Sequence, residues 1–190
     1  MNDLAPSFQA AAPQREAPNN LEVEQALLGA ILVNNSAFYR VSDFLKPEHF
    51  YEPLHRKIYE LAGDTIRMDK IANTITLKTH LPANVKVGDL TVAQYLARLA
   101  AEAVTIINAE DYGRTIYDLA IRRQLIEIGE DVVNTAYDAP IDMPPSEQIE
   151  ETERKLFALA ETGRYEGGFQ TFENAVSIAI DMAGKAFESD

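Results

Sequence analysis

A proline-free stretch decides the fold of this chain: residues 109–137, which read AEDYGRTIYDLAIRRQLIEIGEDVVNTAY. Asn108 lies three residues before Asp111, a spacing typical of the capped start of a helix. A helix over the whole stretch would be roughly 43 Å long, whereas a small helical core spans only ~30 Å. The far half of this helix is therefore expected to project from its domain.

A return helix is predicted at residues 146–161, after a turn rich in proline. Its Ile149, Leu156 and Leu159 are expected to face the first helix. Two consecutive helices that leave a domain form an αα-hairpin, which exposes apolar surface unless another protomer covers it.

The apolar residues of the long helix cannot all face the return helix. Each residue turns a helix by about 100°, so Ile128 points away from Ile126. We therefore expect one of these two faces to meet a second copy of the chain, and Ile128 and Leu156 are candidates for that interface.

A third amphipathic pattern follows Gly163, Gly167 and Gly168. Its apolar residues recur at helical spacing: Phe172, Ala175, Val176, Ala179, Ile180, Ala183 and Phe187. This stripe is expected to dock on the earlier domain, on another chain or on a part of the protein beyond Asp190. Phe172, Val176 and Ile180 are thus further oligomer-interface candidates, and the pattern favours an assembly module over a complete enzyme.

The first half of the chain carries several shorter helical patterns. They begin near Glu22, Ser36, Pro53, Ile75 and Val92, with a loop expected at residues 82–88. The sequence around Ile71 and residues 75–77 suits a strand but is too short to build a sheet. We predict an all-α fold with a disordered tail at 1–18, a compact helical bundle at 19–107, a projecting hairpin at 108–161 and a linker with its amphipathic helix at 162–190.

Composition and charge exclude several functional classes. The chain has no cysteine, which favours a reducing compartment, and it has no apolar run long enough to cross a membrane. Residues 1–107 have a charge balance of −2 and residues 108–190 a balance of −11, out of a total of −13. An acidic half binds phosphates poorly; it suits either a solvated helical surface or a docking face for a basic partner.

No constellation for catalysis or metal binding is found. The pattern G-x-x-x-x-G-K-[ST] of a phosphate loop is absent, and His49, His55 and His80 lack the spacing of metal ligands on one helix face. The histidines are expected to cap helices or to lie at the edge of the core. The densest basic spot, Arg122-Arg123, is expected to pair with Glu127 or Asp118.

Several segments together resemble the N-terminal domain of bacterial replicative DNA helicases of the DnaB family. Residues 20–29, NLEVEQALLG, resemble that family's opening motif I-E-A-E-Q-x-x-L-G. Phe50-Tyr51 with His55 and Ile58-Tyr59 resembles its segment F-Y-x-x-x-H-x-x-I-F. Residues 95–99, then Asn108 and Tyr112, then residues 122–126 follow in the family's order. The resemblance covers about residues 19–187 and departs from the family pattern around residues 63–73.

This resemblance implies an N-terminal collar domain plus linker helix, with a RecA-like ATPase motor expected after Asp190. In the family, hairpins pair two by two into a hexamer built as a trimer of dimers, and the collar recruits the C-terminal helical domain of primase. The motif positions that carry over as primase-binding candidates are Glu22, Tyr95, Ile126 and Val132. For Ile126 and Val132, packing within the hairpin is an equal alternative, and Tyr95 is expected in the core with its hydroxyl at the surface.

The leading hypothesis is thus a module for oligomerisation and primase recruitment at the replication fork, within a cytoplasmic helicase that unwinds duplex DNA. No cofactor is expected in this segment; ATP and magnesium would bind the motor, and so would DNA, while a helicase loader is a further possible partner. The alternative is an autonomous all-α adaptor that has no motor domain.

Overall fold

The structure is a computed structural model of the 190-residue chain, and it describes residues 15–82, 86–103, 108–139 and 143–163. Three interface candidates, Phe172, Val176 and Ile180, lie outside these residues. The expected linker helix and most of the expected N-terminal tail lie outside them as well.

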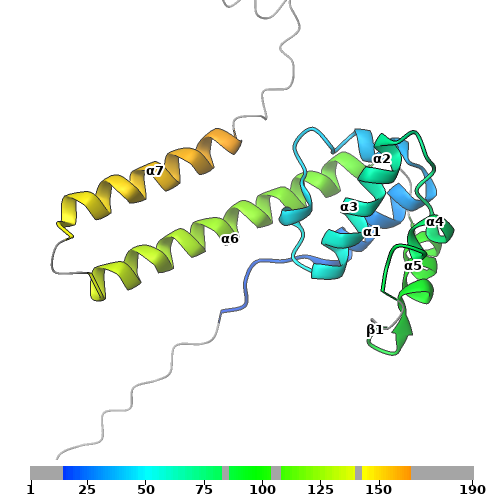
Figure 1. The fold of residues 1–190 in the computed structure, drawn as a ribbon, viewed down its shortest axis with the longest axis horizontal. Helices are drawn as coiled ribbons and strands as arrows, with labels where there is room; N and C mark the ends of the chain where they lie inside the picture. The colour runs from blue at the N-terminus through cyan, green and yellow to red at the C-terminus, as the bar shows by residue number, and fades with distance from the viewer. Residues whose placement is uncertain (1–14, 83–85, 104–107, 140–142, 164–190) are drawn as a thin grey trace, which may run out of the picture.

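The described residues form a helical head from which one long hairpin extends (Figure 1). The elements in chain order are α1 (Leu21–Val33), α2 (Ser36–Tyr39), the 3-10 helix η1 (Pro47–His49), α3 (Pro53–Arg67), α4 (Thr74–Lys78), β1 (Lys86–Val87), β2 (Leu90–Thr91), α5 (Val92–Ala101), α6 (Ala109–Tyr137) and α7 (Pro145–Gly163). The predicted all-α fold, with its bundle and projecting hairpin, is confirmed.

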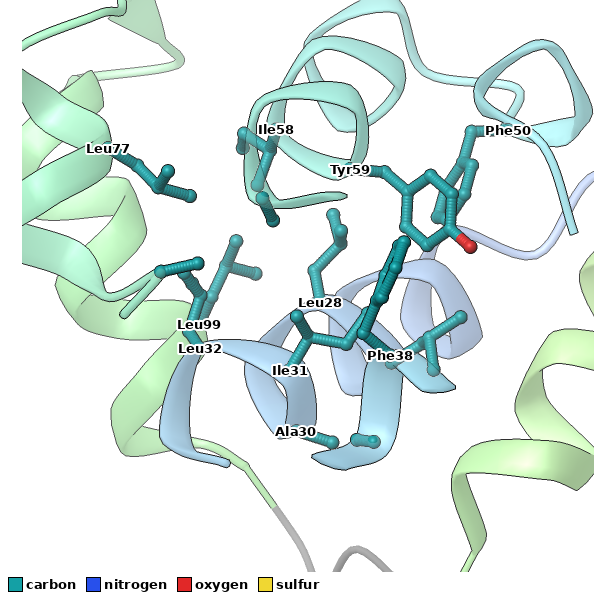
Figure 2. Packing of buried hydrophobic residues seen from close by; sticks show 14 of the residues in the cluster. Leu28, Ala30, Ile31, Leu32, Phe38, Phe50, Ile58, Tyr59, Leu77 and Leu99 are labelled. Atoms are coloured by element: carbon teal, nitrogen blue, oxygen red, sulfur yellow. The ribbon is translucent and has the colours of Figure 1, made fainter. Parts of the chain in front are cut away.

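Helix α1 is the centre of the head. Asn20 caps it by accepting a hydrogen bond from the backbone N–H of Val23 at 3.1 Å. Its residues 27–32 are buried on every side, between α3, α5 and α6. Figure 2 shows side chains of α1 meeting Phe38 of α2, Ile58 of α3 and Leu99 of α5 in one apolar cluster.

Helix α6 belongs to both parts of the molecule. Its buried residues, among them Ala109, Ile116 and Ala120, all lie in its first twelve positions, where it packs on α1, η1 and α2. Beyond Ala120 it leaves the head, and α7 runs back beside it (Figure 1). Asn108 is the N-cap residue, but its side chain makes no capping hydrogen bond, so the predicted cap with Asp111 is not formed.

Two details of the head differ from the sequence prediction. The expected loop at 82–88 contains β1, which pairs with β2 in a two-residue antiparallel hairpin; Gly88 takes a left-handed conformation with φ 58° at its turn. The short helix expected near residues 75–81 begins earlier, at Thr74, because the side chain of Asn73 accepts hydrogen bonds from the N–H groups of Ile75 and Thr76.

The segment that departs from the resembled family pattern is a tight turn. Helix α3 ends at Arg67, Asp69 has a positive φ of 56°, and every residue from 67 to 71 is exposed. The Asn35 side-chain amide fastens the end of this turn: it donates to the carbonyl of Ala72 at 2.7 Å and accepts from its N–H at 3.0 Å. The turn is therefore anchored while its tip stands in solvent.

Candidate protein–protein interface

The contact between α6 and α7 is largely polar. Gln148 Nε2 donates to the carbonyl of Val132 at 2.8 Å, and Lys155 Nζ lies 3.3 Å from an Asp131 carboxylate oxygen. Thr135, Thr152 and Glu151 line a small crevice in the same seam. Exposed ion pairs of this kind contribute only about 0–1 kcal/mol. Most large apolar side chains of the projecting hairpin remain exposed beside this seam.

The predicted inward orientation of two α7 residues is wrong. Ile149 and Leu156 are exposed, and of the three residues expected to face α6 only Leu159 is half-buried. The reason is that polar positions of α7, among them Gln148 and Lys155, bond to α6 and fix the rotation of α7 about its axis.

The apolar residues of the projecting half of α6 also form an exposed stripe. Ile126, Val133 and Tyr137 are spaced at i, i+7 and i+11, which places them within about 40° of one another around the helix. Their exposed fractions are 45%, 53% and 86%. Gly129 borders this stripe, about 40° around the helix from Val133, and no heavy atom comes within 4 Å of the position that a Cβ would occupy there.

Helix α7 carries a matching stripe. Ile149, Leu156 and Phe157 are exposed, and Glu153 lies among them. Around the helix axes, the α6 stripe lies roughly 170° from the seam residues Asp131, Val132 and Thr135. Ile149 and Leu156 lie roughly 100° from the α7 seam residues Gln148 and Lys155. Both stripes therefore point away from the seam, on the outer surface of the hairpin. We call this surface the apolar hairpin face; it is formed by Ile126, Gly129, Val133, Tyr137, Ile149, Leu156 and Phe157.

The apolar hairpin face is the strongest binding feature among the described residues. Complete burial of a large aliphatic or aromatic side chain is worth about 1.5–3 kcal/mol. In a single chain, six such side chains on this face remain exposed to solvent. Contiguous apolar surface of this kind marks a protein–protein contact. An antiparallel helical pair with one apolar side suits packing against a second pair as a four-helix bundle.

The candidate residues on the hairpin fall on two different surfaces. Ile126 and Leu156 belong to the apolar hairpin face. Ile128 and Val132 are half-buried and share the opposite flank of α6, where Val132 meets α7. The expected divergence of Ile126 and Ile128 is thus present, with Ile126 as the outward residue.

The remaining two candidates lie in the head. Glu22 is exposed on the first turn of α1. Tyr95 is 3% exposed, and its hydroxyl is 2.6 Å from His55 Nε2 and 3.1 Å from Gln25 Nε2. Glu22 lies one helical turn before Gln25, the residue that bonds Tyr95. Val132 lies on the projecting hairpin, twelve residues beyond Ala120, the last buried residue of α6. The four primase-binding candidates do not form one patch.

The burial of Tyr95 reveals a polar network that the sequence analysis missed. His55 Nδ1 is 2.6 Å from Glu24 Oε2, and Glu24 Oε1 accepts from the N–H of Tyr51 at 2.6 Å. Glu24 and His55 are 2% and 1% exposed, so His55 lies within the core rather than at its edge. Burial raises the pKa of Tyr95, which keeps its hydroxyl protonated as a donor. The network connects α1, α3 and α5, and its sequence signal is polar residues at positions that helical periodicity assigns to the core.

Arg123 is a second structural polar residue. It donates from Nη1 to the carbonyl of Pro18 at 2.8 Å and from Nη2 to that of His49 at 2.6 Å, with its guanidinium 5.6 Å from the ring centre of Tyr51. The predicted pairing with Glu127 or Asp118 is wrong for this residue, because both acids lie on its own helix while the chain entering the head supplies closer acceptors.

Across 15–82, 86–103, 108–139 and 143–163, no group of three His, Cys, Asp or Glu side chains is arranged to hold a metal ion. Among the helices in those ranges, none is long and apolar enough to span a membrane.

Comparison with known proteins gives a consistent result. Residues 16–118 match the family model of the DnaB-like helicase N-terminal domain. The chain is 42% identical over 176 residues to the replicative DNA helicase DnaB of Rickettsia typhi, covering 93% of this chain and 35% of that protein, and 26% identical over 170 residues to that of Geobacillus stearothermophilus, covering 88% and 36%. The chain therefore spans about a third of the length of these relatives.

A solved structure supports the same assignment. The crystal structure of the N-terminal domain of DnaB helicase from Mycobacterium tuberculosis superimposes with a TM-score of 0.67 at 26% identity. The match covers 75% of this chain and 99% of that one.

Proposed function

The chain belongs to the family of DnaB-like helicase N-terminal domains, and on that premise we propose that it forms the collar of a hexameric replicative DNA helicase. In this proposal the chain assembles the ring, and a motor elsewhere in the protein uses ATP and magnesium to unwind duplex DNA at the fork. The observation that carries the proposal is the apolar hairpin face, which one copy leaves exposed while its α6–α7 seam is polar.

The proposed contact is two-fold. Two hairpins pack through their apolar faces into a four-helix bundle, with α6 of one copy lying along α6 of the other at Gly129. The open space at Gly129 supports this arrangement, because the absence of a side chain lets a neighbouring helix approach closely.

Primase is the proposed second partner of the collar. Of the four candidate contacts, Glu22 and Ile126 have exposed side chains, while Tyr95 and Val132 are engaged within the chain. Ile126 lies on the apolar hairpin face that the proposed pair buries, so we assign direct contact with the helical domain of primase to Glu22 and give Tyr95 and Val132 a supporting role. A helicase loader, and a location at cytoplasmic replication forks, belong to the same proposal.

Gly129→Leu tests the proposed hairpin pairing. In a single chain a Cβ at position 129 has no neighbouring atom within 4 Å, and leucine favours a helix over glycine by roughly 0.8 kcal/mol, so the hairpin should stay folded. In the pair it would fill the space that the partner helix needs. We expect sedimentation velocity to show weaker self-association and circular dichroism to show undiminished helix content.

Asn134→Leu is the matched control. Asn134 is exposed on α6 and lies about 140° around the helix from Gly129, on the flank that points away from the proposed crossing of the two helices. It should associate as the wild type does. Equal association of the wild type and Gly129→Leu would overturn the proposed pairing. Binding of the primase helical domain to Glu22→Lys, whose side chain lies outside the hairpin, separates loss of primase from loss of the pair.

A further inference from the structure

One end of the head carries a charge opposite to that of the molecule as a whole. Residues 65–88 hold four basic residues and one acid, in a chain of net charge −13. Lys70 and Lys78 are exposed there, and neither makes an ion pair within the described residues. Met68, Ile71 and Ile75 lie beside them with exposed fractions of 65%, 70% and 67%. We call these five residues the cationic end.

The cationic end has the composition of a contact surface. Its three apolar side chains stand around a shallow groove between α3 and α4, which Lys70 also lines together with Asp64, the ion-pair partner of Arg67. The anchored turn at 67–71 holds Met68 and Lys70 outward in a defined position. An apolar patch with cations at its border selects a partner surface that is apolar and acidic.

A cleft on the opposite part of the head has those properties. It lies between the η1 side of the head, α6 and the last turns of α7, and it has a volume of about 770 Å³. Asp43, Glu48 and Glu161 line it, with Lys46 also at its rim. Its floor is aromatic: the rings of Phe44 and Tyr117 meet edge to face at 6.2 Å. We call it the acidic cleft.

We propose that the cationic end of one copy docks into the acidic cleft of a neighbouring copy. Met68 suits the aromatic floor, since a thioether packs favourably against aromatic rings. Lys70 and Lys78 suit the three carboxylates of the cleft, none of which has an ion-pair partner among the described residues. The two surfaces are complementary in charge and lie on different parts of the same chain.

The contact between the cationic end and the acidic cleft would also supply the second interface that a hexameric ring requires. This step rests on the proposed function. A two-fold contact through the hairpin faces uses the same patch on both copies and closes at two. A ring of six needs a second contact that joins one pair to the next. A contact between two different patches is heterologous and continues from copy to copy until a ring closes.

Charge reversal on each surface tests this contact. One variant carries Lys70→Glu and Lys78→Glu; the other carries Asp43→Lys and Glu161→Lys. All four side chains are exposed, so both variants should fold. Each variant alone should remain a hairpin-paired dimer, with assembly beyond the dimer weakened roughly tenfold or more, because like charges now face each other.

Mixing the two variants gives the decisive result. In an equimolar mixture the reversed end of the first variant can meet the reversed cleft of the second, and the two unaltered surfaces can meet each other. Every contact between unlike copies is then complementary in charge again. We expect sedimentation velocity to show larger assemblies in the mixture and not in either variant.

The control carries Lys57→Glu and Arg98→Glu, which makes the same change in net charge as reversal of the cationic end but lies outside both surfaces. It should assemble as the wild type does. Three outcomes would overturn the contact: wild-type assembly of either surface variant, failure of their mixture to recover, or an equal loss of assembly in the control. None of these bears on hairpin pairing, which Gly129→Leu tests through the dimer itself. Failure of the proposed function and failure of this contact are therefore distinguishable.

Discussion

The two adjacent arginines of α6 show how differently neighbouring residues are used. Arg123 bonds two backbone carbonyls, of Pro18 and His49, while Arg122 is exposed. Burial lowers the pKa of Arg123, which still remains charged at neutral pH. The sequence predicted both as surface ion pairs, since the chain that supplies the carbonyls lies far from α6 in the sequence.

This contrast gives a prediction for the pair. Arg123→Met removes both donors and leaves two carbonyls without their bonds, so it should lower the free energy of unfolding by about 1–3 kcal/mol. Arg122→Met should change it by less than about 0.5 kcal/mol, as exposed substitutions do. Urea titration followed by circular dichroism measures both; equal effects would contradict the assigned role of Arg123.

The buried network marks the other limit of sequence reasoning at single residues. Helical periodicity places Tyr95 in the core, and this is confirmed, but its hydroxyl was expected at the surface and instead bonds His55. The helical period of the sequence and the polarity of a side chain predict the face of the helix on which a residue lies. They do not say which polar group of another helix lies opposite, because that depends on how α1, α3 and α5 cross.

Among the elements, the contact of α1 with α5 depends on one missing side chain. A Cβ at Gly29 would collide with the backbone carbonyl oxygen of Leu99, and backbone cannot rotate away as a side chain does. Gly29→Ala should therefore separate the helices and lower the free energy of unfolding by about 1–3 kcal/mol.

Gly129→Ala is the matched comparison for that prediction. It makes the same chemical change in a helix but in open space, so it should leave stability unchanged or raise it by up to about 1 kcal/mol. Thermal unfolding at a concentration where the chain is monomeric measures both. A Gly29→Ala protein as stable as Gly129→Ala would show that α5 does not approach α1 this closely.

The helices were predictable, including the short α2 and α4, whereas the two short strands were not. The 29-residue α6 and the return helix follow from an uninterrupted period and the prolines between them. The β1–β2 hairpin has two residues in each strand and carries no period at all. Its position depends on Gly88 and on packing against α5, so the sequence predicted only a loop.

At the scale of the whole molecule, charge separates assembly from DNA binding. The net charge is −13, and α6 and α7 carry most of the acids in the described part of the second half. Since affinity for DNA comes mainly from cations on phosphates, this chain should bind single-stranded DNA weakly. Fluorescence anisotropy at physiological salt tests this; tight, salt-sensitive binding would contradict it.

The apolar hairpin face could be expected from the sequence only in outline. Projection follows from helix length, and a need for a partner follows from projection. Which residues face outward depended on the rotation of α6 about its axis, which is set inside the head where Gly113 lies against Val41. Ile128, an oligomer-interface candidate, is half-buried beside Val132 on the flank toward α7, and its interface role stays a prediction.

Because α6 is one unbroken helix, a change in its tilt within the head displaces its far end. From Ala120 to Tyr137 the free arm is about 26 Å long. A tilt of α6 by about 10° within the head would displace the far end by about 4.5 Å, which approaches the rise of one helical turn. Substitutions around Val41 and Gly113 would therefore change the angle at which the apolar hairpin face meets a neighbouring copy, although neither residue is part of that face.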